Sequence, residues 1–166
     1  MVDSGKLIYS KHIREIRSMI ENCVNSDLNT LEEIITISIL SSIINTEPEA
    51  GILIKNVTDS LLTWNDSPAD GYFRKFKIGN EIVAFILIKE YWNLSHLFVL
   101  PSYQKQGIGR KLLLTGMESC KEKSPKHKID LNSSINAAGF YRRLGFVKSG
   151  VGKDLPGGCI PFEYRF

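Results

Sequence analysis

Apolar side chains recur at a helical spacing near the start of the chain. Residues 6–9 are predicted as a short strand, and Ser10 as the cap of the helix that follows. The apolar positions of this helix are Ile13, Ile16, Met19, Ile20 and Val24. Residues 25–29 are predicted to end it. Thr30-x-x-Glu33 is a capping-box pattern that opens a second helix, reaching about Ile44. The isoleucines and threonines of this second segment would also tolerate a strand.

The hydrophobic period changes from helical to alternating at residue 72. Before it, residues 45–71 contain two prolines and two glycines and follow no single period, and 51–57 fit either a short strand or a short helix. From Tyr72 onward, apolar and polar side chains alternate. This period of two predicts strands over 72–78 and 81–89, joined as a tight hairpin through Gly79-Asn80.

The second half of the chain alternates between strand and helix patterns. A strand over 93–99 is followed by a helix from Gly107 to about Glu122, then by a buried strand from Ile129 and a helix that ends before Gly145. The inward side of the first helix is predicted to carry Ile108, Leu112, Leu113 and Met117. Two closing strands, 146–149 and 160–166, are separated by a loop rich in glycine and proline. This order of elements predicts an α/β layered fold with a sheet of mixed direction.

Length and composition fit one domain over residues 1–166, since typical domains run to ~100–200 residues. The formal charge of +3, from 21 basic and 18 acidic residues, is too small to indicate a nucleic-acid partner. No apolar run approaches the ~20 residues of a membrane span. The cysteines, which are Cys23, Cys120 and Cys159, are odd in number and widely spaced, and indicate neither disulfides nor a metal site. We therefore expect a cytoplasmic protein with no metal, nucleic acid or membrane partner, and the sequence leaves its oligomeric state open.

The segment 97–112 has the composition of an anion-binding loop. An apolar strand end leads through a turn into Gln104-x-x-Gly107-x-Gly109 and then into an amphipathic helix. The two glycines let the backbone approach an anion, and the first amides of the helix are free to donate hydrogen bonds. Arg110 and Lys111 add full charges, although both also fit a solvated helix start. The spacing does not match a P-loop, which needs Gly-x-x-x-x-Gly-Lys-[Ser/Thr]. It does not match a dinucleotide fingerprint either, because the third glycine of that fingerprint is missing where Leu112 stands.

This segment resembles the acetyl-CoA signature of the GNAT N-acetyltransferase superfamily. In that signature a strand ending in a hydrophobic-Val-x-Pro pattern leads into [Gln/Arg]-x-x-Gly-x-[Gly/Ala]. The resemblance implies a GNAT-like layered fold: a central, mixed and mostly antiparallel sheet with helices on both faces, whose two central strands separate to admit the thioester. It also implies a set of cofactor-binding residues in this part of the chain: Leu97, Phe98, Val99, Gln104, Lys105, Gln106, Gly107, Ile108, Gly109, Arg110 and Lys111.

A second block resembles the next strand and helix of the same family. The family helix usually reads Asn-x-x-Ala-x-x-Phe-Tyr-x-x-x-Gly-Phe. The residues kept here are Ala137, Phe140, Tyr141, Gly145 and Phe146. Ser134 stands where the family has the asparagine that contacts the pantetheine arm. Asn132 and Asn136 lie two residues to either side, so one of these three is expected to make the contact, with Tyr141 beside it.

The resemblance also implies roles in acetyl transfer. The backbone amide of Val99 would polarise the thioester carbonyl, and Tyr141 would protonate the departing thiolate, although Phe140-Tyr141 also fits an aromatic pair that only packs the helix. Family members that act on small molecules often carry Glu-Asp where this chain has Ser95 and His96. His96 is the candidate base, but strand alternation turns it away from Ser95 and Leu97, and Glu90 and Glu163 are alternatives.

The function expected from this resemblance is N-acetylation, an acyltransferase activity of EC class 2.3.1. The acetyl group would pass from acetyl-CoA to a primary amine by direct attack in a ternary complex. The acceptor amine is unidentified. The alternative is an acyl-CoA-binding regulatory module without catalytic activity, because the family's glutamate and asparagine are both missing.

Overall fold

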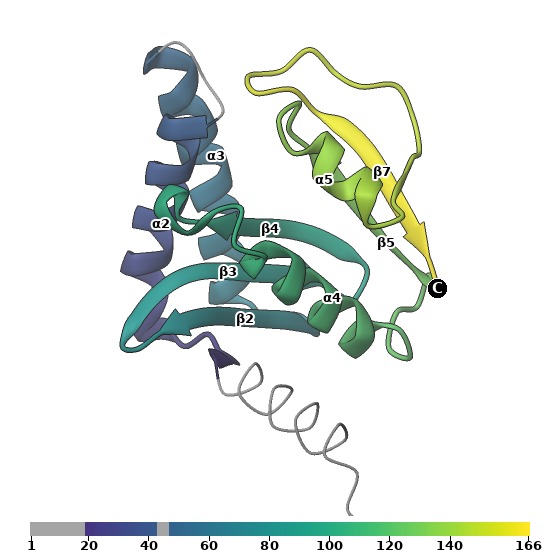
Figure 1. Cartoon of the computed structure of the whole chain (residues 1–166), viewed down its shortest axis with the longest axis horizontal. Helices are drawn as coiled ribbons and strands as arrows, with labels where there is room; N and C mark the ends of the chain where they lie inside the picture. Colours follow the sequence, from purple (N-terminus) through teal and green to yellow (C-terminus); the bar gives the residue numbers. More distant parts are fainter. Residues whose placement is uncertain (1–18, 43–46) are drawn as a thin grey trace, which may run out of the picture.

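A seven-stranded mixed sheet forms the centre of the structure, with helices packed on both of its faces (Figure 1). The computed structural model describes residues 19–42 and 47–166. The strands are β1 (Ile20–Asn22), β2 (Gly71–Ile78), β3 (Glu81–Lys89), β4 (Asn93–Val99), β5 (Lys128–Ser133), β6 (Val147–Lys148) and β7 (Ile160–Arg165). The helices are α2 (Leu28–Ser42), α3 (Glu47–Asp66), α4 (Ile108–Cys120) and α5 (Ala138–Arg143), with single 3-10 turns at η1 (Asn25–Asp27) and η2 (Pro101–Tyr103).

The sheet contains one parallel junction, between β4 and β5. The strand order is β1-β2-β3-β4-β5-β7-β6, and every other neighbouring pair is antiparallel. The strands β4 and β5 pair only where Asn93 meets Asp130 and Leu94 meets Leu131. Beyond Leu94 the two strands separate, which opens the sheet at its centre (Figure 1). The predicted mixed, mostly antiparallel α/β fold is confirmed.

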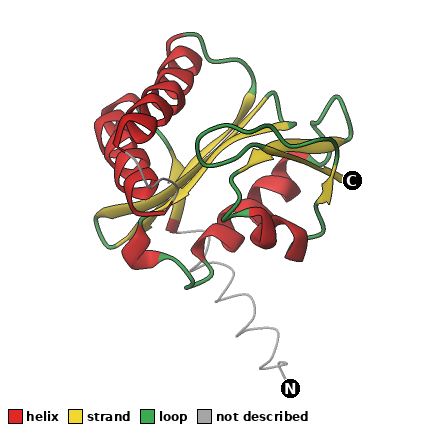
Figure 2. Cartoon of the chain, turned by 90° about the horizontal axis from the view of Figure 1, so that it is seen from above, coloured by secondary structure: helices red, strands yellow, loops and turns green. Residues whose placement is uncertain are grey.

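The strand β3 lies between two helical layers. Its segment from Val83 to Ile88 is fully buried, as a strand covered on both faces requires. Phe85 and Leu87 pack against α2 and α3, whereas Ala84, Ile86 and Ile88 belong to the core under α4 and α5. Figure 2 shows the two long helices on one side of the strands and the shorter ones on the other.

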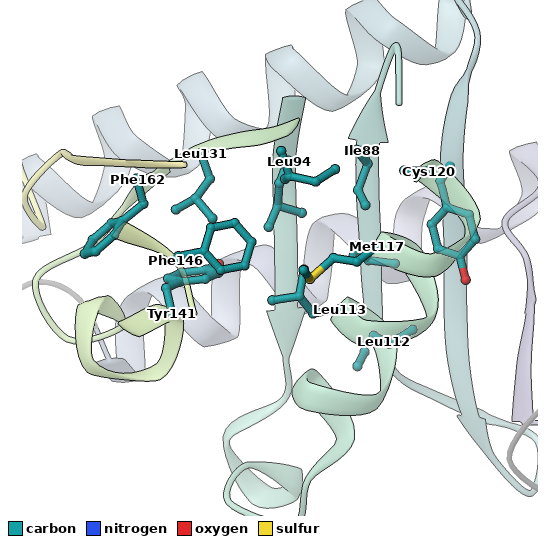
Figure 3. Close-up of a cluster of buried hydrophobic side chains, with 14 of the residues drawn as sticks. Ile88, Leu94, Leu112, Leu113, Met117, Cys120, Leu131, Tyr141, Phe146 and Phe162 are labelled. Atoms are coloured by element: carbon teal, nitrogen blue, oxygen red, sulfur yellow. The ribbon is translucent and has the colours of Figure 1, made fainter. Parts of the chain in front are cut away.

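The helix α4 covers the second face with the side chains predicted for it. Ile108, Leu112, Leu113 and Met117 are all buried. Figure 3 shows Leu113 and Met117 directed toward Leu94 on β4. The rings of Tyr141 on α5 and Phe162 on β7 belong to the same core. This continuous packing fixes the start of α4 relative to the end of β4.

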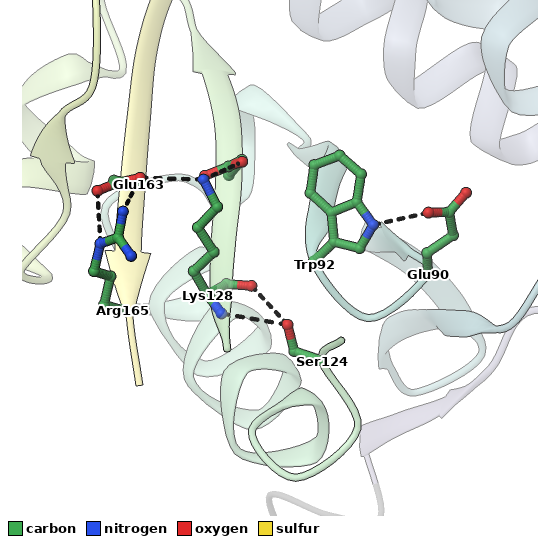
Figure 4. Close-up of polar contacts among 7 residues, drawn as sticks. Glu90, Trp92, Ser124, Lys128, Glu163 and Arg165 are labelled. Carbon is green, nitrogen blue, oxygen red and sulfur yellow. Dashed lines mark hydrogen bonds and ion pairs between the residues drawn. The ribbon is translucent and has the colours of Figure 1, made fainter. Parts of the chain in front are cut away.

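Polar contacts hold the far end of the sheet together (Figure 4). The ammonium of Lys128 on β5 lies 3.2 Å from a carboxylate oxygen of Glu163 on β7, and Arg165 binds the same carboxylate. The hydroxyl of Ser124 donates to the carbonyl oxygen of Lys128 at 2.9 Å. On the β3–β4 turn, Trp92 Nε1 donates to Glu90 at 2.8 Å.

The predicted secondary structure of the N-terminal segment was wrong for the residues that the structure describes. The predicted strand 6–9 and the helix from Ser10 lie mostly outside the described residues, but Ile20–Asn22 forms the edge strand β1 rather than a helix end. Ile20 pairs there with Phe76 of β2, a contact that local periodicity does not encode. The helix α2 begins at Leu28, so Thr30 lies inside it and does not cap it. Asp27 instead accepts a hydrogen bond from Val24 N at 2.8 Å and pairs with buried Lys75.

Residues 47–66 form the longest helix described, where the sequence assigned no single element. Pro48 is tolerated because it stands in the first turn, where a backbone N–H would have no helical acceptor. The closing strands are shorter than predicted, Val147–Lys148 and Ile160–Arg165. Within the described residues, no helix is both long and apolar enough to cross a membrane. The single domain over residues 1–166 stays a prediction.

Candidate active site

A cavity of about 600 Å³ opens where β4 and β5 separate. Its wall comes from α2, the end of β4, the loop that leads into α4, and the connection from β5 to α5. The predicted site residues that line it are Leu97, Phe98, Val99, Gln104, Lys105, Gly107, Ile108, Gly109, Arg110, Ser134, Asn136 and Tyr141. The structure thus brings both sequence blocks to one cavity.

The start of α4 presents unpaired backbone donors to this cavity. Gly107 caps the helix with φ +83°, and Lys105 two residues earlier also has a positive φ, of 60°. The first helical hydrogen bond runs from Lys111 N to Gly107 O at 2.9 Å, which leaves the amides of Ile108, Gly109 and Arg110 ahead of it. Within the part of the chain that the structure describes, no side chain caps the start of α4, and the first turn of α4 holds no acidic residue. The arrangement is suited to an anion, because the donors and the helix dipole act in the same direction.

The charged side chains on this wall are all basic. Among the described lining residues, Lys105, Arg110 and Arg143 carry charge. Gly109 lines the cavity with its backbone. A Cβ added at this position would meet two other lining residues, Val99 at 3.4 Å (Cγ2) and Phe140 at 3.8 Å (Cζ). These are ordinary contacts, so the glycine is not required for packing within the protein. The positive wall complements a ligand with several phosphate charges.

The backbone of Val99 is turned toward the open side of β4. Val99 pairs with Ala84, and the next amide, that of Leu100, donates to Val83 O at 2.9 Å. In an antiparallel ladder this pattern marks Val99 and Ala84 as a pair that exchanges no hydrogen bonds. The N–H and C=O of Val99 therefore point away from β3, into the gap that β5 leaves.

The same alternation applies to the two residues before Val99. The N–H and C=O of Leu97 also face the gap, whereas those of Phe98 are directed to β3, where Phe98 pairs with Phe85. The expectation that Phe98 contributes main-chain contacts to a pantetheine arm is corrected accordingly. Leu97 and Val99 offer the backbone groups, and Phe98 lines the cavity without them.

Tyr141 lies on α5 (Figure 3). It lines the cavity and is 8% exposed. Its ring packs against Phe140, Phe146 and Phe162. Burial raises the pKa of the Tyr141 phenol above its usual value, so the hydroxyl keeps its proton at neutral pH. Both interpretations of the Phe140-Tyr141 pair thus have a structural basis, because the ring packs the helix and the residue also lines the cavity.

His96 lies outside the lining of the cavity and on the opposite face of the sheet. It is 2% exposed, and its Nε2 atom is 3.0 Å from the carbonyl oxygen of Val57 on α3. Burial lowers the pKa of the imidazole to about 4, and the charge of Lys89 acts in the same direction, while the bond to Val57 opposes them. The alternatives are engaged elsewhere: Glu90 binds Trp92, and Glu163 binds Lys128 and Arg165.

Three other predicted residues also lie outside the lining. Gln106 donates to Ser102 O at 3.1 Å, Lys111 N is already used in the first helical hydrogen bond, and Asn132 is exposed on β5. Of the three candidates for the missing asparagine, Ser134 and Asn136 line the cavity. The hydroxyl of Ser134 accepts a hydrogen bond from Ala137 N at 3.2 Å.

Sequence reasoning missed several residues of the wall. They are Ser38, Tyr103, Ala137, Phe140, Arg143 and Leu144. Four of these belong to the second sequence block, and two of the four, Ala137 and Leu144, stand four residues before and three residues after Tyr141, a helical spacing that was a usable signal. Ser38 had none, because it comes from α2, 61 residues before the Val99 that it contacts.

Comparisons with known proteins agree with this geometry. A sequence model described as an acetyltransferase (GNAT) domain matches residues 65–155. No curated protein matches the chain. Among solved structures, a GCN5-related N-acetyltransferase from Rhodopseudomonas palustris has a TM-score of 0.75 at 15% identity, covering 89% of this chain and 94% of its own.

Two further solved structures share the fold. The PaiA N-acetyltransferase of Thermoplasma acidophilum, in complex with coenzyme A, has a TM-score of 0.69 at 24% identity, with coverage of 89% and 98%. The ribosomal-protein-S18-alanine N-acetyltransferase of Escherichia coli has a TM-score of 0.65 at 16% identity, with coverage of 88% and 92%.

Proposed function

Because the chain belongs to the GNAT acetyltransferase family, we propose that it transfers an acetyl group from acetyl-CoA to a primary amine. The observation that carries the proposal is that the amides at the start of α4 receive no side-chain cap from the described residues and face a cavity opened by the separation of β4 and β5. Both the anion-binding amides and the gap are needed for a ligand that joins a pyrophosphate to a thioester.

The residues that line the cavity offer groups suited to both the pyrophosphate and the thioester end of acetyl-CoA. The amides of Ile108, Gly109 and Arg110 would hold the pyrophosphate, with the side chains of Lys105 and Arg110 adding charge. The backbone N–H and C=O of Leu97 and the amide of Val99 would bind the pantetheine arm and thioester. Ser134 and Asn136 would face that arm from the β5 side.

Two groups of the chain would act on the reacting atoms. The Val99 amide would donate to the thioester oxygen as negative charge develops on it, and a fixed backbone donor of this kind is effective in acyl transfer. The Tyr141 hydroxyl would give its proton to the departing thiolate. We assign no protein base to the amine, so its proton would pass to water after direct attack in the ternary complex.

An assay of thiol release with a panel of amines tests this function. The panel contains an amino acid, a dipeptide, a lysine peptide, a polyamine and an aromatic amine, each mixed with acetyl-CoA. For at least one acceptor, we expect free thiol to be released at the same rate as acetylated amine is formed. Mass spectrometry detects the acetylated amine. Acetyl-CoA binding without turnover would support the regulatory module instead. Acetylated protein formed in the absence of amine would contradict direct attack.

A further inference from the structure

The carbonyl oxygen of Val99 accepts hydrogen bonds from two side chains that are distant in sequence. Ser38 Oγ on α2 lies 3.3 Å from it, and Gln104 Nε2 in the loop before α4 lies 3.0 Å from it. The N–H of the same peptide unit belongs to Leu100 and donates to Val83 O at 2.9 Å. This peptide unit is therefore held at both of its polar ends.

The two donors approach from different parts of the fold. Ser38 is 4% exposed and belongs to the helical layer that covers one face of the sheet, whereas Gln104 belongs to the anion-binding loop. Both also line the cavity. The end of β4 thus connects the α2 layer to the loop through a single carbonyl oxygen.

We propose that Ser38 and Gln104 act jointly as positioning residues for the thioester, by fixing the end of β4 through the Val99 carbonyl. This inference rests on the proposed acetyl transfer. Among residues 19–42 and 47–166, no strand pairs with the open side of β4 beyond Leu94, so the sheet holds the end of β4 from the β3 side alone. The side-chain bonds from Ser38 and Gln104 supply the missing restraint on the open side.

The restraint matters because the Val99 amide can stabilise the thioester oxygen effectively only if it already points toward that oxygen before the reaction. A donor that is fixed before the reaction stabilises developing charge without a cost of reorganisation. The N–H and C=O of Val99 lie on either side of one Cα, so release of the carbonyl frees the residue that carries the amide. Neither side chain has to touch the reacting atoms for this effect.

Three variants test the inference: Ser38→Ala, Gln104→Met and the double variant. Alanine is favourable in a helix, and methionine keeps the length of glutamine without a donor, so all three are expected to fold. The matched control is Ser41→Ala, which lies one turn further along α2 and removes a hydroxyl that donates to Ser38 O. Each protein is assayed for kcat at saturating acetyl-CoA and for acetyl-CoA affinity by calorimetry.

We expect each single variant to lower kcat by about five- to tenfold, the size of one hydrogen bond. The acetyl-CoA Kd of Ser38→Ala should stay within about twofold of wild type, and Ser41→Ala should keep the wild-type kcat. Because both donors hold one carbonyl, the double variant should lose little more than the worse single variant. Ser38→Thr, which keeps the hydroxyl, should retain more activity than Ser38→Ala.

Three results would overturn the inference. Wild-type kcat in Ser38→Ala would remove Ser38 from the reaction, and a double variant equal to the product of the singles would show that the donors act independently. A loss in Ser38→Ala that appears only in the acetyl-CoA Kd would make it a binding residue. These results leave acetyl transfer itself intact. Failure of the wild-type protein to turn over any amine would instead contradict the proposed function, and this inference with it.

Discussion

The Nε2 atom of His96 lies 3.0 Å from the carbonyl oxygen of Val57, which joins β4 to α3 on the face of the sheet away from α4. The imidazole ring packs beside the aromatic rings of Phe85 and Phe98, which stack on each other. A neutral ring in this position can donate one hydrogen bond to the helix without carrying a charge into the core. We therefore propose a structural role for His96.

The pH dependence of stability should reveal this buried neutral histidine. Its pKa is about 4 in the folded protein and 6.5 when solvated, so the unfolded chain binds more protons between these values. The free energy of unfolding should fall as the pH drops from about 6.5 to 4, by roughly 3 kcal/mol in total. His96→Gln keeps a donor but does not titrate. Urea unfolding at pH 7 and pH 4.5 should show a smaller loss in this variant than in wild type.

The same variant separates a structural His96 from a catalytic one. If His96 is structural, His96→Gln keeps the acidic limb of the pH profile of kcat/KM. Disappearance of that limb in the folded variant would make His96 the base after all.

Tyr141→Phe tests the proposed general acid. The change removes one hydroxyl and keeps the ring that packs on Phe146 and Phe162. We expect kcat to fall on the order of a hundredfold, within the ~10²–10⁴ range of general acid catalysis, with acetyl-CoA affinity nearly unchanged. Steady-state kinetics and calorimetry measure the two quantities. Wild-type turnover in a folded Tyr141→Phe protein would assign the residue to packing alone.

Substitution of Gly107 and of Gly51 by alanine should change the free energy of unfolding in opposite directions. A Cβ at either position meets open space, but Gly107 has φ +83° whereas Gly51 lies inside α3. Gly107→Ala should lower the free energy of unfolding by about 1 kcal/mol, because the left-handed region strains an L-residue. Gly51→Ala should raise it by about 0.5–1 kcal/mol. Chemical denaturation measures both, and equal stability of the two variants would contradict a left-handed Gly107.

The sequence predicted best those elements whose signals are local. The hairpin β2–β3 follows a clear period of two around Gly79-Asn80, and α4 follows a glycine loop with its four inward residues correctly assigned. The strand β1 was missed because Ile20 also fits a helical period, and only its pairing with Phe76 makes it a strand. The helix α3 was missed because Pro48 and Gly51 obscured its period.

The site shows the same limit. Strand alternation predicted that His96 and Leu97 face opposite sides, and the structure confirms it. The motif predicted the residues from Gln104 to Arg110 before and at the start of α4, whose proposed role depends on the local backbone. Ser38 could not be found in this way, because its contact with Val99 arises only when α2 packs on the sheet.

Acetyl-CoA binding to wild type, Gly109→Ala and Gly109→Asp tests the central claim most directly. A Cβ at residue 109 would make only ordinary contacts. An acidic side chain in the first turn interacts favourably with the helix dipole, so both variants should be as stable as wild type. In Gly109→Asp, however, the carboxylate would occupy the position proposed for the pyrophosphate. Calorimetry should give tight binding to wild type, weaker binding to Gly109→Ala, and a Kd raised on the order of a hundredfold or more in Gly109→Asp. An unchanged Kd in a folded Gly109→Asp protein would contradict the account, because acetyl-CoA would then bind away from the start of α4.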